Sequence, residues 1–236
     1  MISAARTHIG KVRASNQDAI LVCPGKHGIF GVADGMGGHK AGDVASRIAV
    51  EVTEKALKNT HPSAVLLRSA IQEANLAIYR EQQRNPDFSG MGTTMTVIWE
   101  DDDRVLLGHV GDSRAYRVRE KTIRQISLDH SMVAEMVRRG VLTEEEARVH
   151  PYRNIITRAL GTDETVDVDV EELDKRTGDL YLLCSDGLSE YIQDEGMLHI
   201  LRKHPSLEEA ADTLLQLALE GGGRDNISVV LAEVTS

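Results

Sequence analysis

Two amphipathic helices are expected to follow one another directly, and this pattern constrains the fold more than any other feature of the sequence. Apolar residues recur at spacings of three and four over residues 41–57 and 62–84. Short segments rich in Val, Ile, Leu and Thr come before and after this pair. Runs of strands and runs of helices, without strict alternation, are typical of α+β proteins. We therefore predict antiparallel sheets covered by helices.

The expected strands are short and bounded by turn-forming residues. They are residues 19–23, 28–33, 93–100, 104–111, 114–120, 122–126, 166–170, 179–185 and 227–234. The four segments between 93 and 126 are predicted to form an antiparallel meander, with 101–103 as a solvated hairpin turn. Strict alternation over 166–170 indicates an edge strand.

Three further helices are predicted in the second half of the chain. Residues 131–139 have Ser131 as a candidate N-cap and Gly140 as a stop, and residues 207–219 form the last helix. Thr143 and Glu146 have the spacing of a capping box, which predicts another helical turn.

Length and composition favour a single domain over residues 1–236. The chain has a mass of 25.9 kDa and is 41% hydrophobic, but only 3% of its residues are aromatic. Aliphatic side chains must therefore fill the core. The sequence contains no repeat or linker, and Cys23 and Cys184 form no disulfide framework.

Charge and hydropathy argue against two classes of partner. The formal net charge is -10, so a nucleic acid is expected to be repelled. No apolar stretch reaches the roughly 18 residues that a membrane span needs, and the start lacks a secretory signal. We expect a cytoplasmic protein, with a monomer as the default.

Several aspartates close or precede apolar strands and are followed by small or turn-forming residues. They are Asp34, Asp112, Asp186 and Asp225. A carboxylate at the end of a buried strand loses solvation, and hydrogen bonds or a cation must offset that loss. Oxygen ligands without histidine or thiolate partners favour Mg²⁺ or Mn²⁺. Taken singly, each such aspartate is better explained by a turn or a helix cap, and only the four together favour a shared cation.

The order of the motifs resembles that of the metal-dependent protein phosphatases, and the chain looks like a bacterial member of the type 2C (PPM) Ser/Thr phosphatase family. The resemblance covers residues 13–230. It rests on Arg13 with Asn16-Gln17-Asp18, Asp34-Gly35-Met36-Gly37-Gly38, Gly92-Thr93-Thr94, Gly111-Asp112-Ser113-Arg114, Asp129-His130-Ser131, Ser185-Asp186-Gly187 and Gly223-Arg224-Asp225-Asn226. It implies a four-layer α/β/β/α sandwich of two antiparallel sheets flanked by helices.

The resemblance also implies metal ligands at the matching positions. Asp34 resembles the carboxylate that bridges two Mg²⁺ or Mn²⁺ ions, and the carbonyl of Gly35 matches a ligand of the second ion. Asp186 and Asp225 resemble ligands of the first ion. Asp18 resembles a residue that acts on the second ion through water.

Three other roles follow from the same resemblance. Asp112, together with Asp186, resembles the pair that holds a third, weaker ion in bacterial relatives. Asn226 resembles a residue that supports Asp225. Arg13 resembles the guanidinium that binds the substrate phosphate, a task that suits its planar pair of donors.

The implied reaction is hydrolysis of phosphoserine and phosphothreonine in proteins, in opposition to a Ser/Thr kinase. Two divalent ions lower the pKa of a bridging water, which attacks phosphorus without a phosphoenzyme. The leaving alkoxide needs a proton. Some family members place a histidine directly after Asp-Gly, but Met36 stands there, so His39 is the nearest candidate and a metal-bound water is the alternative.

Residues 140–161 correspond to the mobile flap that the family carries beside the metal site. Because loops beside a rigid site often set selectivity, we predict that this flap contacts the phosphoprotein substrate. Two other functions remain open at this point. One is a pseudophosphatase binding module without turnover, and the other is a phosphohydrolase that acts on small molecules.

Overall fold

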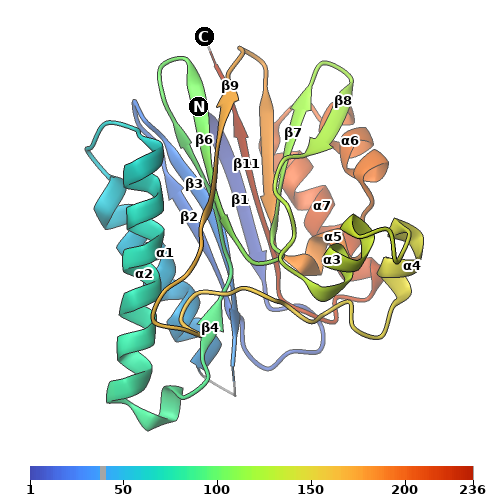
Figure 1. Cartoon of the computed structure of the whole chain (residues 1–236). Helices are drawn as coiled ribbons and strands as arrows, with labels where there is room; N and C mark the ends of the chain where they lie inside the picture. The colour runs from blue at the N-terminus through green and yellow to red at the C-terminus, as the bar shows by residue number, and fades with distance from the viewer. Residues whose placement is uncertain (38–40, 236) are drawn as a thin grey trace.

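The computed structural model describes residues 1–37 and 41–235, whose strands form two antiparallel sheets packed face to face (Figure 1). The five-stranded sheet has the order β1 (Ile2–His8), β11 (Ile227–Glu233), β10 (Leu180–Cys184), β7 (Arg114–Arg119) and β8 (Thr122–Gln125). The other has the order β2 (Asp18–Cys23), β3 (Ile29–Met36), β5 (Met95–Glu100), β6 (Arg104–Val110) and β9 (Asp169–Asp174). Short β4 (Gly92–Thr93) pairs with the end of β3.

Helices cover the outer face of each sheet and complete the four predicted layers. The sheet that contains β3 is covered by α1 (Ala41–Leu57) and α2 (Ala64–Arg84), after which a 3₁₀ turn spans Pro86–Phe88. The five-stranded sheet is covered by α5 (Asp186–Ser189), α6 (Asp194–Lys203) and α7 (Leu207–Gly221). Between β8 and β9 lie α3 (Met132–Arg138) and α4 (Glu144–Val149). The α/β/β/α sandwich is therefore confirmed.

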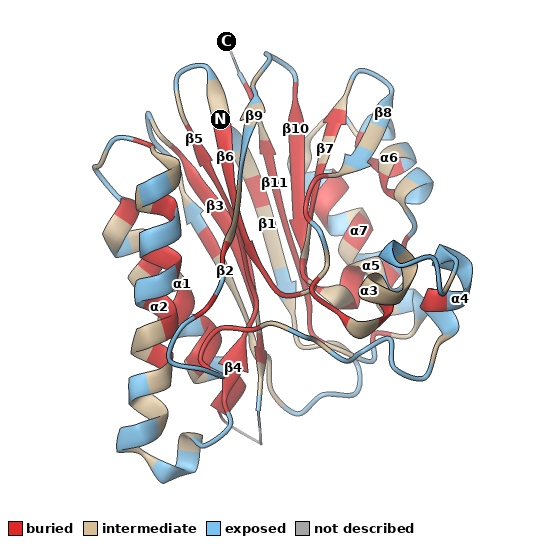
Figure 2. Cartoon of the chain, viewed as in Figure 1, coloured by how far each residue is buried: buried red, intermediate tan, exposed pale blue. Residues whose placement is uncertain are grey.

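The core is aliphatic, as the composition requires. Phe30, Ile98, Leu183 and Val230 are fully buried between the two sheets. Separate apolar clusters fill the space between each sheet and its helices. Figure 2 shows the buried residues concentrated along the strands and on the inner sides of the helices. Among the described helices, none is long and apolar enough to cross a membrane.

The predicted meander is wrong, because its four segments divide between the two sheets. β5 pairs with β6, whereas β7 pairs with β8 and β10 in the opposite sheet. The chain crosses between the sheets at the turn that contains Gly111, which has a φ of +112°. Each segment has strand propensity, but propensity does not say which sheet a strand joins.

The predicted edge strand begins later than expected, at Asp169. Val166 and Val168 pack into the cluster under α2, and their carbonyls accept hydrogen bonds from Gln72 and Arg68 of that helix. Side chains of a helix, not a neighbouring strand, therefore satisfy this part of the backbone. The expected turn at 101–103 is confirmed, but β1, α5 and α6 were not predicted from the sequence.

Buried His109 predicts a pH dependence of stability. Its Nδ1 lies 2.9 Å from Oγ1 of Thr96 and its Nε2 lies 3.1 Å from the carbonyl of Leu128. Burial lowers the pKa of His109 to about 4. Between pH ~4 and pH ~6.5 the unfolded chain binds a proton at His109 and the folded chain does not. The contribution of His109 to the free energy of unfolding is therefore fully present above pH ~6.5 and is lost as the pH falls toward ~4.

We expect His109→Gln to remove this pH dependence, which changes the free energy of unfolding by at most about 1.4 kcal/mol per pH unit. The measurement is urea unfolding of both proteins between pH 7 and 4.5, with exposed His199→Gln as the control. Parallel pH curves for wild type and His109→Gln would contradict the prediction.

Candidate metal centre

Strand ends from both sheets carry the predicted aspartates to one edge of the sandwich. Asp18 begins β2 and stands opposite Asp34 of β3 in the register of that sheet. Asp186 follows β10, and Asp225 precedes β11 in the other sheet. Asp112 follows β6. Their mutual repulsion contributes to raising the pKa values of Asp34 and Asp186, which places the carboxylates within electrostatic range of one another.

Asp18 joins the two sheets through its carboxylate. Oδ2 accepts hydrogen bonds from Oγ of Ser185 over 2.8 Å and from Oγ of Ser228 over 2.7 Å. Oδ1 is buried and has no hydrogen-bond partner among residues 1–37 and 41–235. Burial raises the pKa of Asp18 to about 6, against the opposing effect of the two serine hydroxyls. One oxygen is thus anchored, and the other is left available as a ligand.

Asp34 is held through its backbone by the side chains of Thr93 and Thr94. Its N–H donates to Oγ1 of Thr94 over 2.9 Å, and its carbonyl accepts from Oγ1 of Thr93 over 2.9 Å. Burial, followed by repulsion from Asp18, raises its pKa well above the usual value. A Cβ on Gly35 would stand 2.0 Å from the carbonyl oxygen of Gly42, so only glycine fits here.

Asp186 opens α5 beside the start of β11. A Cβ on Gly187 would stand 2.0 Å from the carbonyl oxygen of Asn226, so glycine allows this close approach. Oδ1 of Asp186 is buried and has no hydrogen-bond partner in the described part of the chain. Burial, followed by repulsion from Asp112, raises the pKa of Asp186 well above the usual value. Burial also raises the pKa of Asp112 to about 7.

Arg13 and Asn226 organise the loop that enters β2. Nη2 of Arg13 lies 2.5 Å from Oδ2 of Asp225, and about half of the Arg13 side chain is exposed. Asn226 supports Asp225 through its backbone N–H, which donates to Oδ1 over 2.8 Å. Its side chain instead holds the loop: Oδ1 accepts from Gln17, and Nδ2 donates to the carbonyls of Ile9 and Ser15.

These donors fit a hard divalent cation. Asp18 and Asp186 each have a buried carboxylate oxygen with no partner among the described residues, and such an oxygen is costly unless a proton or a cation meets it. The surrounding ligands are oxygen atoms, which Mg²⁺ and Mn²⁺ prefer. His39 lies outside the described residues. The sequence analysis quoted Ser185 and Thr94 within the motifs but assigned them no role, and it missed Ser228. A hydroxyl that anchors a residue of another strand has no sequence pattern of its own.

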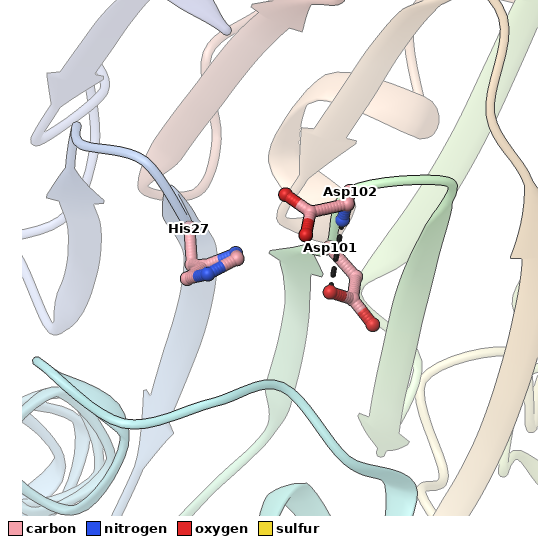
Figure 3. A group of neighbouring side chains, drawn as sticks. All are labelled: His27, Asp101 and Asp102. Carbon is pink, nitrogen blue, oxygen red and sulfur yellow. Dashed lines mark hydrogen bonds between the residues drawn. The ribbon is translucent and has the colours of Figure 1, made fainter.

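A second cluster lies elsewhere, at neighbouring turns of β2–β3 and β5–β6 (Figure 3). Ligand atoms of His27, Asp101 and Asp102 lie within 4.8 Å of one another. Within residues 1–37 and 41–235, no three of the predicted aspartates have ligand atoms that all lie within this distance of one another. Oδ2 of Asp101 accepts from Arg104 over 3.1 Å, and Oδ1 of Asp102 lies 3.7 Å from Lys26. Because protein cations already pair with these carboxylates, the cluster is accounted for without a metal.

Comparison with known proteins agrees with the geometry. A family model described as Protein phosphatase 2C matches residues 6–228. The chain belongs to the protein phosphatase 2C family. Serine/threonine protein phosphatase PstP of Mycobacterium tuberculosis is 42% identical over 234 residues, which are 98% of this chain and 44% of PstP. Serine/threonine phosphatase stp of Listeria welshimeri is 42% identical over 97% of this chain and 94% of stp.

Solved structures of family members superpose closely on this chain, which spans less than half the length of PstP. The crystal structure of PstP/Ppp from Mycobacterium tuberculosis has a TM-score of 0.93 and 41% identity, and the match covers 100% of this chain and 99% of that one. The catalytic domain of PstP in complex with two manganese ions has a TM-score of 0.88 and 39% identity, with 100% and 98% coverage.

Asp186→Asn is expected to stabilise the metal-free protein at pH 8 and to weaken its response to Mn²⁺. The substitution removes a buried charge whose pKa is raised, and it removes one candidate ligand oxygen. Mn²⁺ at 100 times its dissociation constant would stabilise wild type by about 2.7 kcal/mol, and most of this should be lost. Thermal unfolding with chelator and with Mn²⁺ tests both effects, and exposed Asp103→Asn is the control. An undiminished Mn²⁺ shift in Asp186→Asn would argue against this site.

Proposed function

We propose that this chain hydrolyses phosphoserine and phosphothreonine in proteins and requires Mg²⁺ or Mn²⁺. The observation that carries the proposal is the meeting of Asp18, Asp34 and Asp186 at the edge of both sheets. Two of their oxygens are buried and have no hydrogen-bond partner among the residues that the structure describes. Family membership and relatives named as Ser/Thr phosphatases support the same activity.

Each polar residue has a proposed task in this site. Asp34, the Gly35 carbonyl, Asp186 and Asp225 would hold two ions, and Asp18 would act on one of them through water. When bound, the ions supply Lewis-acid activation of water and neutralise charge on the phosphate. A third ion at Asp112 and Asp186 is part of the proposal, supported by the raised pKa of both carboxylates.

Arg13 is proposed to bind the substrate phosphate. Its guanidinium pairs with Asp225 through Nη2 and is about half exposed, so its remaining donors can reach a ligand from solvent. The proton donor to the leaving group stays a prediction, with His39 and water as the two candidates.

The flap, residues 140–161, is proposed to contact the protein substrate. The predicted capping box is present: Thr143 accepts from the N–H of Glu146, and Glu146 accepts from the N–H of Thr143. Val141, Val149 and Tyr152 expose at least half of their surface. A segment that exposes several apolar side chains suits a protein substrate better than a small phosphate ester.

The wider setting is also proposed. A Ser/Thr kinase would supply the phosphoproteins, the chain would act as a monomer, and the free thiols Cys23 and Cys184 favour the reducing cytoplasm. Nothing observed favours a pseudophosphatase, because the aspartates and Arg13 of the matching motifs are all present.

Phosphate release from a phosphothreonine peptide tests the activity directly. We expect turnover with Mn²⁺, none after chelation, and a loss of at least about 100-fold in Asp34→Ala and Asp186→Ala. Turnover that survives chelation would refute the metal-dependent reaction. Mn²⁺ binding without any turnover by wild type would instead favour a binding module.

Arg13→Ala should raise KM by about ten- to a hundredfold and lower kcat much less, because a charged hydrogen bond to the phosphate is lost while the carboxylates remain. Steady-state kinetics on the same peptide measure this split. Exposed Arg202→Ala on α6 is the matched control. An unchanged KM in Arg13→Ala would remove its assigned role.

A further inference from the structure

The buried ring of His130 holds the turn that leads into Asp112. The backbone N–H of Gly111 donates to Nδ1 of His130 over 3.0 Å, and the N–H of His130 donates to the Gly111 carbonyl over 2.8 Å. A Cβ on Gly111 would stand 2.5 Å from Cγ2 of Thr94, so this turn is tightly packed as well. These contacts fix the direction in which Asp112 leaves β6.

The other nitrogen of the same ring faces Asp169 of β9, which also pairs with a residue of the flap. Because Nδ1 accepts a hydrogen bond, Nε2 carries the proton, and it donates to Oδ2 of Asp169 over 3.1 Å. Oδ1 of Asp169 accepts from Nη1 of Arg158 over 2.8 Å. Arg158 belongs to residues 155–160, which we call the flap stem. Asp169, at the start of edge strand β9, is therefore a shared acceptor for the ring and the stem.

The backbone of the flap stem is bonded to the carriers of two candidate ligands. The N–H of Thr157 donates to the carbonyl of His130 over 2.8 Å. The N–H of Leu160 donates to the carbonyl of Thr93 over 2.8 Å, and Oγ1 of Thr93 donates to the carbonyl of Asp34. The stem thus reaches the segment of Asp34 through Thr93, and it reaches the segment of Asp112 through the backbone of His130. Arg158 and Asp169 add a second connection to the Asp112 segment, and this one passes through the His130 ring.

We propose that His130 and Asp169 are positioning residues that couple docking of the flap to ion binding at Asp112. This rests on the proposed function, in which Asp112 is a ligand. When the stem is docked, Arg158 donates a hydrogen bond to Asp169. Asp169 in turn accepts from the His130 ring, and the ring accepts from the N–H of Gly111. Because coupling between two sites is reciprocal, an ion at Asp112 slows opening of the flap, and a docked flap strengthens binding of that ion.

Two substitutions of His130 separate the two sides of the ring. The amide of His130→Asn reaches the position of Nδ1 and can keep the bond from Gly111, but it is too short to reach Asp169. The longer His130→Gln can reach Asp169 and leaves the Gly111 N–H without its acceptor. Asp169→Asn is a third, milder variant, because this side chain is about 43% exposed and the amide keeps one acceptor. His199→Asn, exposed on α6, is the control.

Hydrogen exchange of residues 143–154 in the full chain, with and without saturating Mn²⁺, measures the coupling, and calorimetry measures Mn²⁺ affinity. In wild type and His199→Asn, Mn²⁺ should slow the exchange. In His130→Asn and Asp169→Asn this slowing should shrink by roughly two- to twelve-fold, the range that one hydrogen bond supplies. In His130→Gln the weakest Mn²⁺ binding step should lose affinity by a similar factor.

A merely structural role for His130 would speed exchange equally with and without Mn²⁺ and would leave the effect of Mn²⁺ unchanged. That result in all three variants, with normal Mn²⁺ binding and turnover in wild type, would overturn this inference and leave the proposed function intact. Failure of wild type itself to bind Mn²⁺ would overturn the proposed function.

Discussion

Crowding of buried carboxylates at the edge of the sandwich is the constraint on which the site depends. Asp18, Asp34 and Asp186 are costly to bury as anions, and their raised pKa values express that cost. The fold does not relieve the cost with arginine or lysine at each carboxylate. One oxygen of Asp18 is anchored on serines, whereas Oδ1 of Asp18 and Oδ1 of Asp186 have no partner within the described ranges, which suits binding of a cation.

Two aliphatic sheets are the rigid frame that makes this crowding tolerable. The strands that carry the aspartates are pinned by antiparallel pairing and by fully buried neighbours such as Val32 and Leu183. Glycine at positions 35 and 187 allows the segments to approach within distances that a Cβ would prevent. Stability is therefore supplied by the core, and the chemistry is concentrated at one edge of it.

The sequence predicted the architecture better than the pairing. The limits of α1 were predicted to the residue, because its apolar spacing is long and regular. The segments near 93–126 were recognised as strands, yet their division between two sheets depends on the turn at Gly111, and strand propensity says nothing about partners. Helix α5 is only four residues long and β1 contains several polar residues, so neither has a clear apolar periodicity in the sequence.

The candidate ligands were recognised mainly from an ordered set of motifs, since each aspartate alone resembles a turn residue. The structure places Asp18, Asp34, Asp186, Asp225 and Arg13 in one neighbourhood. It also shows contacts between segments that are far apart in the sequence, which motifs cannot reveal. The bonds of Asp18 to Ser185 and Ser228 and the bond of His130 to Asp169 are of this kind.

The Asn226 side chain has a consequence for the order in which the protein matures. It fastens the loop from Ile9 to Gln17, so a residue near the end of the chain secures the segment that presents Arg13. During synthesis this loop emerges from the ribosome long before Asn226 does. A nascent chain that stops short of Asn226 therefore lacks these contacts, and the segment that carries Arg13 is held only once the last strand is in place.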